Sequence, residues 1–154
     1  DALVYLDRPA WRADIAELAS VSGIDTTTYD GFLDALRQRR AAFAEAGALA
    51  TDHGHLSADT TPMDAPAARD LYARVLNGAE PTEREVAAFA ADMLYRMAEM
   101  SCEDGLVMQI HPGVLRDHHT ATAETYGPDK GYDIPIQTEY TRALRPMLQC
   151  FQRS

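Results

Sequence analysis

Apolar residues in this chain follow two different spacings. Short apolar runs lie at residues 3–6, 48–51 and 106–110, each bounded by polar, glycine or proline residues. Between these runs, apolar residues recur three and four positions apart, which is the period of a helix with one buried face. The pattern therefore predicts three strands separated by helices, with the run 3–6 buried and the run 106–110 buried on both faces, as strands inside parallel sheets are.

Capping residues bound the predicted helices. The strongest start signal is Thr82 with Glu85, the arrangement of a capping box, in which each side chain satisfies a free backbone amide. The predicted helices run from Trp11 to Ser22 with Gly23 as the stop, from a Thr27 or Thr28 cap to Gly47, from Asp64 to Asn77, from Thr82 to the Asp104-Gly105 turn, and from Tyr140 to Phe151 with Pro146 as a kink or new start.

Two groups of side chains on these helices have structural interpretations. Arg37, Arg39 and Arg40 are expected on the solvated outer face of the second helix, and the methionines of the helix after Thr82 are expected in the core. Neither group requires a ligand or a partner.

The order of the elements favours an α/β fold with parallel strands. Long helical connections return the chain to the same edge of a sheet, so consecutive strands run in one direction. Three strands cannot close a barrel. Two architectures fit, a small sheet covered in an unusual way or part of a larger α/β barrel, and we favour the second. Because the chain enters strand-like sequence directly, we expect residues 1–154 to be an interior segment with no separate second domain.

Composition and charge exclude several classes of protein. The net charge of −10 argues against nucleic acids and anionic membrane surfaces as partners, because both require basic patches. No apolar run approaches the roughly 20 residues that a membrane helix needs. Cys102 and Cys150 lie in predicted helices and are expected to be reduced core thiols, so we expect a cytoplasmic protein.

The third predicted strand carries the first candidate site. His111 follows residues 106–110 directly, and Arg116 comes a short loop later. In parallel α/β folds, ligands bind at the carboxyl ends of strands, because the loops there bring side chains from several strands together. His111 is therefore a candidate functional residue. A histidine that only caps the strand through a backbone hydrogen bond is an equally good interpretation.

The second predicted strand leads into the second candidate site, His53-Gly54-His55. Side chains two apart on an extended segment point the same way, so His53 and His55 could share a metal ion. Gly54 indicates that the chain is already turning, which would separate the two rings. A hydrogen-bonded polar loop is the interpretation that we favour.

Four segments resemble the uronate isomerases of the amidohydrolase superfamily. They are Pro9–Asp14, with Ala13 where the family usually has proline, Asp52–Gly54 after a strand, Gln109–Arg116, and Gly127–Asp133. Gln109–Arg116 is the most specific, because the family typically has Gln-Leu-His-Ile-Gly-Ala-x-Arg there. After Asp133 this chain departs from the family pattern, so the resemblance ends at that residue.

The resemblance implies a distorted (β/α)8 barrel of the TIM type with extra helices. It implies an aldose-ketose isomerase that interconverts D-glucuronate and D-fructuronate, and D-galacturonate and D-tagaturonate, through an enediol. Asp52 and His111 would be the catalytic acid/base groups. Arg12 and Arg116 would bind the substrate carboxylate. A zinc ion would take its ligands from strands outside this segment, and the enzyme would be a homo-oligomer.

Two other functions remain open from the sequence. The first is a zinc-dependent hydrolase of the same superfamily, which would use His53, His55 and His111 to hold the metal that activates water. The second is a non-catalytic helical binding module that uses the surface at residues 97–100. The geometry of the three histidines distinguishes the first of these from the isomerase.

Overall fold

A computed structural model describes residues 2–151 of the chain. Its elements are α1 (Trp11–Ser22), α2 (Tyr29–Glu45), β1 (Ala50–His53), α3 (Ala65–Leu76), α4 (Glu83–Asp104), β2 (Val107–Ile110), β3 (Val114–Leu115), α5 (Thr120–Tyr126), β4 (Ile134–Pro135) and α6 (Arg145–Phe151). None of the helices in residues 2–151 combines the length and the apolar character needed to cross a membrane.

The predicted capping residues bound the helices. The Thr28 side chain accepts a hydrogen bond from the Gly31 amide at the start of α2, and the Thr82–Glu85 capping box begins α4. Gly105 ends α4 in the left-handed conformation, with φ of 75°, which a side chain would disfavour. These local signals confirm the predicted helices between residues 11 and 104.

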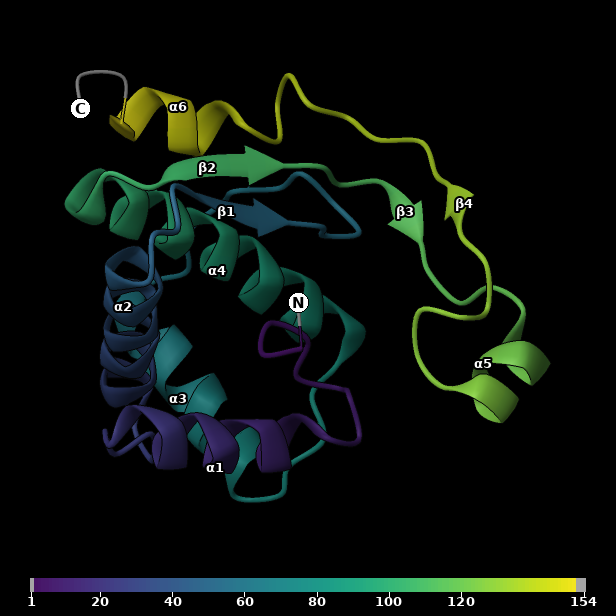
Figure 1. Cartoon of the computed structure of the whole chain (residues 1–154), viewed down its shortest axis with the longest axis horizontal. Helices are drawn as coiled ribbons and strands as arrows, with labels where there is room; N and C mark the ends of the chain where they lie inside the picture. Colours follow the sequence, from purple (N-terminus) through teal and green to yellow (C-terminus); the bar gives the residue numbers. More distant parts are fainter. Residues whose placement is uncertain (1, 152–154) are drawn as a thin grey trace.

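β1 and β2 lie side by side and run parallel (Figure 1). Ala50 pairs with Val107 at one end of the ladder, and His53 pairs with Ile110 at the other. The connection between the two strands consists of α3 and α4, and it returns the chain to the same edge, as the sequence predicts. The parallel α/β arrangement is confirmed for this pair of strands.

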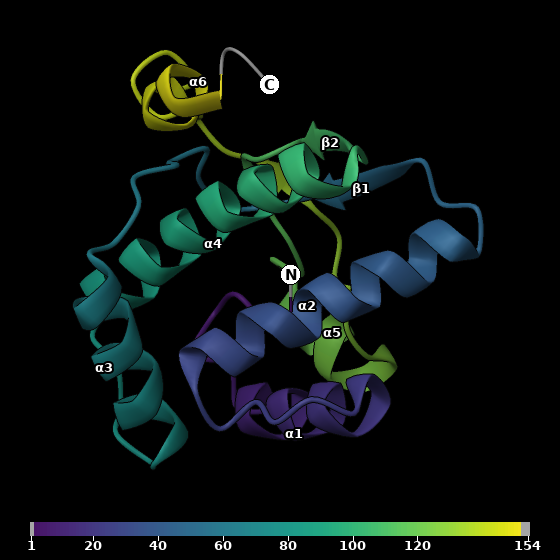
Figure 2. The same cartoon turned by 90° about the vertical axis from the view of Figure 1, so that its left-hand side faces the viewer.

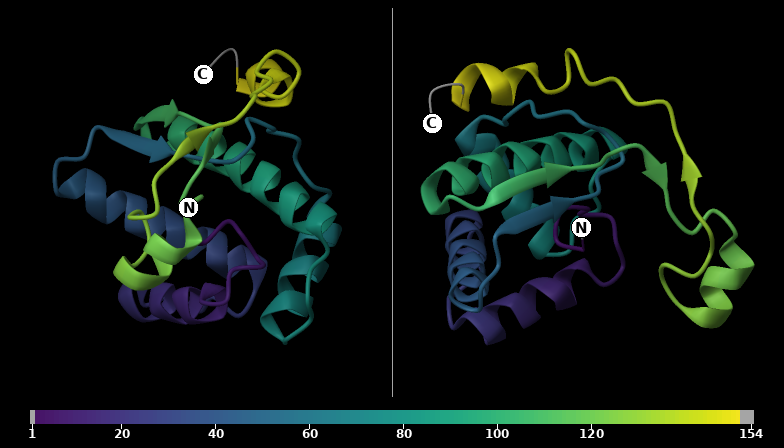
Figure 3. Two further views of the ribbon diagram at one scale, coloured as in Figure 1. Left: turned by 90° about the vertical axis from the view of Figure 1, so that its right-hand side faces the viewer. Right: turned by 45° about the horizontal axis from the view of Figure 1, so that its top comes forward.

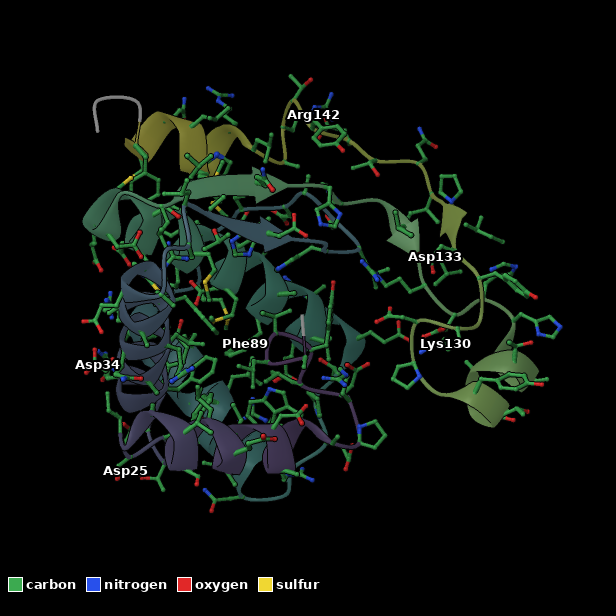
Figure 4. The ribbon with its side chains drawn as sticks, viewed as in Figure 1. Asp25, Asp34, Phe89, Lys130, Asp133 and Arg142 are labelled. Carbon is green, nitrogen blue, oxygen red and sulfur yellow. The ribbon has the colours of Figure 1, made fainter. Side chains whose placement is uncertain are left out.

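A helical core supports the two strands. Helices α1 to α4 surround a cluster of buried aromatic rings, with α1 and α2 on one side and α3 and α4 on the other (Figure 2). Phe89 of α4 lies inside this cluster (Figure 4), in contact with Tyr29, Phe32 and Tyr72. Because burial of such rings is the main source of stability, the helical side of the molecule is the rigid base on which β1 and β2 rest.

The strand predicted at residues 3–6 is absent from the described residues. Residues 2–4, 6 and 7 form turns, and Val4 and Leu6 are buried against the helical core. The prediction of burial is thus right and that of an extended strand is wrong. A strand needs a neighbouring backbone to pair with, and this segment packs its side chains without one.

Three other predictions about exposure are wrong. β2 is not buried on both faces, because Val107 and Gln109 are exposed. Cys102 and Cys150 are exposed free thiols rather than core residues. Arg40 is buried, because its guanidinium forms a bidentate ion pair with Asp104 at 2.6 and 3.0 Å. That ion pair joins α2 to the turn that leads into β2.

Beyond β2 the chain forms an arm, residues 112–139, that stands away from the helical core (Figures 1 and 3). β3 and β4 pair antiparallel within it, and α5 forms its tip. Lys130 and Asp133 lie on this arm (Figure 4). The sequence predicts only a long polar loop here. The last helix, α6, begins at Arg145 beside Pro146, so the proline marks a new start.

Candidate functional site

The two faces of the β1–β2 pair have different surroundings. Thr51 is half-buried and His53 is buried, so they face the helices; both line a cavity with Leu36 of α2 and Met97 of α4, which Asp52 also borders. Asp52 lies between them in sequence and is exposed. Since successive side chains on a strand point to opposite faces, Asp52 projects from the face that the helices leave open.

The same alternation continues on β2. Met108 and Ile110 line a cavity with Met147 of α6, whereas Val107 and Gln109 are exposed. His111 follows in this alternation and is exposed as well. The open face therefore carries Asp52 from one strand and His111 from the next.

His111 and Asp52 form a hydrogen-bonded pair on the open face. The distance from His111 Nε2 to Asp52 Oδ2 is 2.9 Å. The His111 amide donates to the His53 carbonyl at 3.0 Å, which extends the parallel ladder by one bond and fixes the backbone below the ring. The ring thus bonds a carboxylate and not the backbone, which distinguishes His111 from a simple strand cap. The two predicted catalytic residues are brought together.

His53 and His55 are buried on the side of the helices. The His53 Nε2 atom lies 2.9 Å from Thr51 Oγ1, and the centroids of the two imidazole rings are 6.4 Å apart. Burial lowers the pKa of each to about 4, with the charge of Arg40 adding to the effect at His53. Both rings are therefore neutral near pH 7.

This burial separates His53 and His55 from His111. Across residues 2–151, no three His, Cys, Asp or Glu side chains are grouped as metal ligands would be. The hydrolase alternative requires His53, His55 and His111 to surround one ion, and the sheet places His53 and His111 on opposite faces. The favoured interpretation of His53-Gly54-His55 as a hydrogen-bonded polar loop holds in part, because His53 ends β1 with its ring bonded to Thr51 and only Gly54 and His55 follow the strand.

Arg116 lies beyond the carboxyl ends of the strands, at the edge of a hollow of about 540 Å³. The hollow separates the N-terminal turns from the arm, and Tyr5, Arg8, Gly54 and Arg116 are among the residues that line it. Arg116 Nη1 donates to Asp129 Oδ1 at 2.8 Å. Gly54 follows Asp52 by two residues and Arg116 follows His111 by five, so the segments that leave β1 and β2 both continue into the lining of the hollow.

Arg12 does not join this group. Its Nε atom donates to the Val75 carbonyl at 2.8 Å, and its Nη2 atom lies 3.4 Å from the Ala79 carbonyl. These contacts tie α1 to the end of α3. Backbone carbonyls thus occupy the Nε–Nη2 edge of Arg12, and its expected contact with a substrate carboxylate stays a prediction.

Arg8 lines the same hollow as Arg116. Its Nη1 atom donates to the Ala2 carbonyl at 2.7 Å and to Asp14 Oδ2 at 3.1 Å. The sequence contains a signal for it, because Arg8 follows the apolar run 3–6 with one residue between them.

Comparison with known protein families gives one match over the whole chain. The family model described as glucuronate isomerase matches residues 1–154. The uronate isomerase of Mesorhizobium japonicum is 45% identical over 150 residues, which is 97% of this chain and 32% of the relative. The uronate isomerase of Rhizorhabdus wittichii is 48% identical over 151 residues, which is 98% of this chain and 32% of the relative.

Solved structures give the same result. The glucuronate isomerase from Caulobacter crescentus is 40% identical, superposes with a TM-score of 0.90, and is matched over 98% of this chain and 31% of its own. The uronate isomerase from Thermotoga maritima is 32% identical and superposes with a TM-score of 0.91. The match covers 98% of this chain and 34% of the Thermotoga chain. This chain spans about a third of the length of these proteins.

Proposed function

Because this chain belongs to the glucuronate isomerase family, we propose that the complete protein interconverts the aldose and ketose forms of hexuronates. The substrates are D-glucuronate with D-fructuronate and D-galacturonate with D-tagaturonate. The observation that carries this proposal is the hydrogen-bonded pair of Asp52 and His111 on the open face of two parallel strands.

The reaction requires a proton to move between adjacent carbons. A base takes the proton from carbon 2 of the aldose while an acid protonates the oxygen at carbon 1, which gives the enediol. The reverse transfers then protonate carbon 1 and remove the proton from the oxygen at carbon 2, so the net proton count is unchanged. A histidine and a carboxylate that share a hydrogen bond can exchange the roles of acid and base between these steps.

Both members of the pair are accessible to a substrate. The side chain of His111 is 46% exposed and that of Asp52 is 66% exposed, which suits groups that must contact a bound sugar. Arg116 lines the hollow beyond the carboxyl ends of the strands and would supply a cation for the substrate carboxylate. His53 and His55 contribute structure rather than chemistry, since the helices cover them.

The barrel is part of the same proposal. β1 and β2 would be two neighbouring strands of a distorted (β/α)8 barrel, with α2, α4 and α6 outside and Asp52 and His111 at the carboxyl ends that face inward. The exposed side chains of Val107 and Gln109 support this, because side chains on an inward face pack against other strands of a closed barrel.

A zinc ion does not fit the residues described here. Asp52 and His111 are two potential ligands without a third beside them in residues 2–151, so no step of the mechanism uses a metal. We propose that a zinc ion of the complete protein takes its ligands from outside residues 1–154.

The decisive experiment follows ketose formation by the complete protein with D-glucuronate and with D-galacturonate. Isomerisation that is lost in Asp52→Asn supports the proposal, with Asp34→Asn on the outer surface of α2 as the control. Absence of ketose formation, or full activity of Asp52→Asn, would contradict it. Metal-dependent hydrolysis that is lost in His55→Ala would instead support a hydrolase.

A further inference from the structure

One polar side chain interrupts the apolar run that forms β2. Among residues 106–110, Gln109 is the only residue that is not apolar, and its side chain is exposed. A glutamine gains less from a strand position than the apolar and β-branched residues around it. Local preferences of this kind are given up most often at functional sites, so the position of Gln109 points to a role on the open face.

Gln109 lies directly opposite Asp52 in the parallel ladder. Neighbouring strands are about 4.8 Å apart, so the two side chains leave the sheet next to each other. His111 comes two residues later and projects from the same face as Gln109. These three polar side chains therefore adjoin one another at the carboxyl end of the open face. Ala50 and Val107, which pair at the other end of the ladder, are apolar.

The amide of Gln109 is free to bind a ligand. His111 contacts Asp52 through Oδ2 at 2.9 Å, and within residues 2–151 the Gln109 carboxamide has no hydrogen-bonding partner. A carboxamide carries two donors and an acceptor oxygen, so it can donate to a hydroxyl and also accept from one. When a sugar covers this face, water leaves the amide, and an amide left unsatisfied would weaken binding.

The chemistry of the reaction indicates which hydroxyl meets this amide. Carbons 1 and 2 of the hexuronate must lie against Asp52 and His111, which transfer the proton. Carbon 3 is bonded to carbon 2, and its hydroxyl takes no part in the isomerisation. That hydroxyl comes to lie beside the reacting pair, where Gln109 is the adjoining side chain of the sheet.

We infer that the Gln109 carboxamide binds the hydroxyl at carbon 3 of the hexuronate and holds carbons 1 and 2 against Asp52 and His111. This inference rests on the proposed isomerase function. It gives Gln109 a contact with the substrate and no part in the proton transfer. Loss of the amide should therefore impair the reaction of a sugar that has this hydroxyl and spare that of a sugar without it.

The test compares D-glucuronate with 3-deoxy-D-glucuronate as substrates of the complete protein and of Gln109→Met, which keeps the length of the side chain without its amide. With D-glucuronate, kcat/KM of the variant should fall about 10-fold, the effect of a lost hydrogen bond to an uncharged group. With the 3-deoxy sugar, kcat/KM of the variant should stay within about twofold of the wild-type value, because the contact is already missing.

Met108→Leu is the matched control. Met108 is the neighbouring residue of β2 and lines a cavity with Met147 on the other face, so this volume-conserving change should leave kcat/KM unchanged for both sugars. If the 3-deoxy sugar turns over too slowly to measure, its inhibition constant replaces kcat/KM in the comparison.

The outcomes separate this inference from the proposed function. Equal losses with both sugars in Gln109→Met would show a structural role, and an unchanged kcat/KM with D-glucuronate would show no role; either would overturn the inference alone. Wild-type protein without isomerase activity would overturn the proposed function. If Gln109→Met does not fold, as judged by circular dichroism, the same comparison with Gln109→Asn, whose amide is one methylene too short, decides in its place.

Discussion

The imidazole of His111 and the carboxylate of Asp52 are 2.9 Å apart, although 59 residues separate them in sequence. The parallel register explains this proximity, because Asp52 lies opposite Gln109 and His111 is the next residue on the same face. The backbone bond from the His111 amide to the His53 carbonyl holds that register at the strand end. The pair is therefore a product of strand pairing and not of a flexible loop.

Replacing Asp52 with asparagine should lower kcat of the isomerase by about 10²- to 10⁴-fold, the usual contribution of a positioned acid or base. His111→Asn should have a similar effect. The double variant should be little worse than either single one, because the two residues act as a unit. Additive losses in steady-state kinetics would show that they act independently.

The stability of the protein should fall as the pH decreases from about 6.5 to about 4. Burial lowers the pKa of His53 and of His55 to about 4 in the folded state, from an ordinary value of 6.5. In this window the unfolded chain binds protons that the folded chain does not, so acid favours unfolding. Above pH 6.5 both histidines are neutral in the folded and the unfolded chain, and the protein has its full stability. Each histidine contributes a slope of at most about 1.4 kcal/mol per pH unit.

Urea unfolding at several pH values from 7 to 4.5 measures this slope. The double variant His53→Gln, His55→Gln should have a shallower pH dependence than the wild type, and each single variant should fall between them. A double variant with the wild-type slope would assign the acid sensitivity to other groups.

Two neighbouring acidic residues should differ in their effect on stability. Asp104→Asn leaves the buried Arg40 without its carboxylate and should reduce the free energy of unfolding by about 3 kcal/mol. Glu103→Gln breaks the exposed pair with Arg37 and should cost less than about 1 kcal/mol. Denaturant titration of both variants measures the difference, and equal losses would contradict the importance of burial.

Two glycines with similar positive φ angles provide a further comparison. Gly113 and Gly127 have φ of 93° and 95°, so alanine at either position should cost about 1 kcal/mol of stability from backbone strain. A methyl group at Gly113 would also overlap Thr138 Oγ1, whereas the space around Gly127 is open. Gly113→Ala should therefore be about 1 to 3 kcal/mol less stable than Gly127→Ala in thermal unfolding. Since Gly113 lies between His111 and Arg116, only its replacement should also impair the isomerase.

The sequence by itself determined the local features and the side chains that follow strands. Caps such as Thr28 and the Thr82–Glu85 box depend on residues three positions apart, so they can be read directly from the chain. His111 could be predicted from its place directly after an apolar run, whereas Asp52 became a candidate only through the resemblance to the uronate isomerases.

The tertiary structure decided which charged side chains are available to a ligand. Arg8 and Arg12 are both arginines near the start of α1, and only the carbonyls at the end of α3 distinguish them. Likewise, Arg40 is buried because Asp104 meets it across α2 and α4, and His53 is neutral because two helices cover it. Such partners lie 30 or more residues away, and a linear pattern carries no information about which of them a side chain will meet.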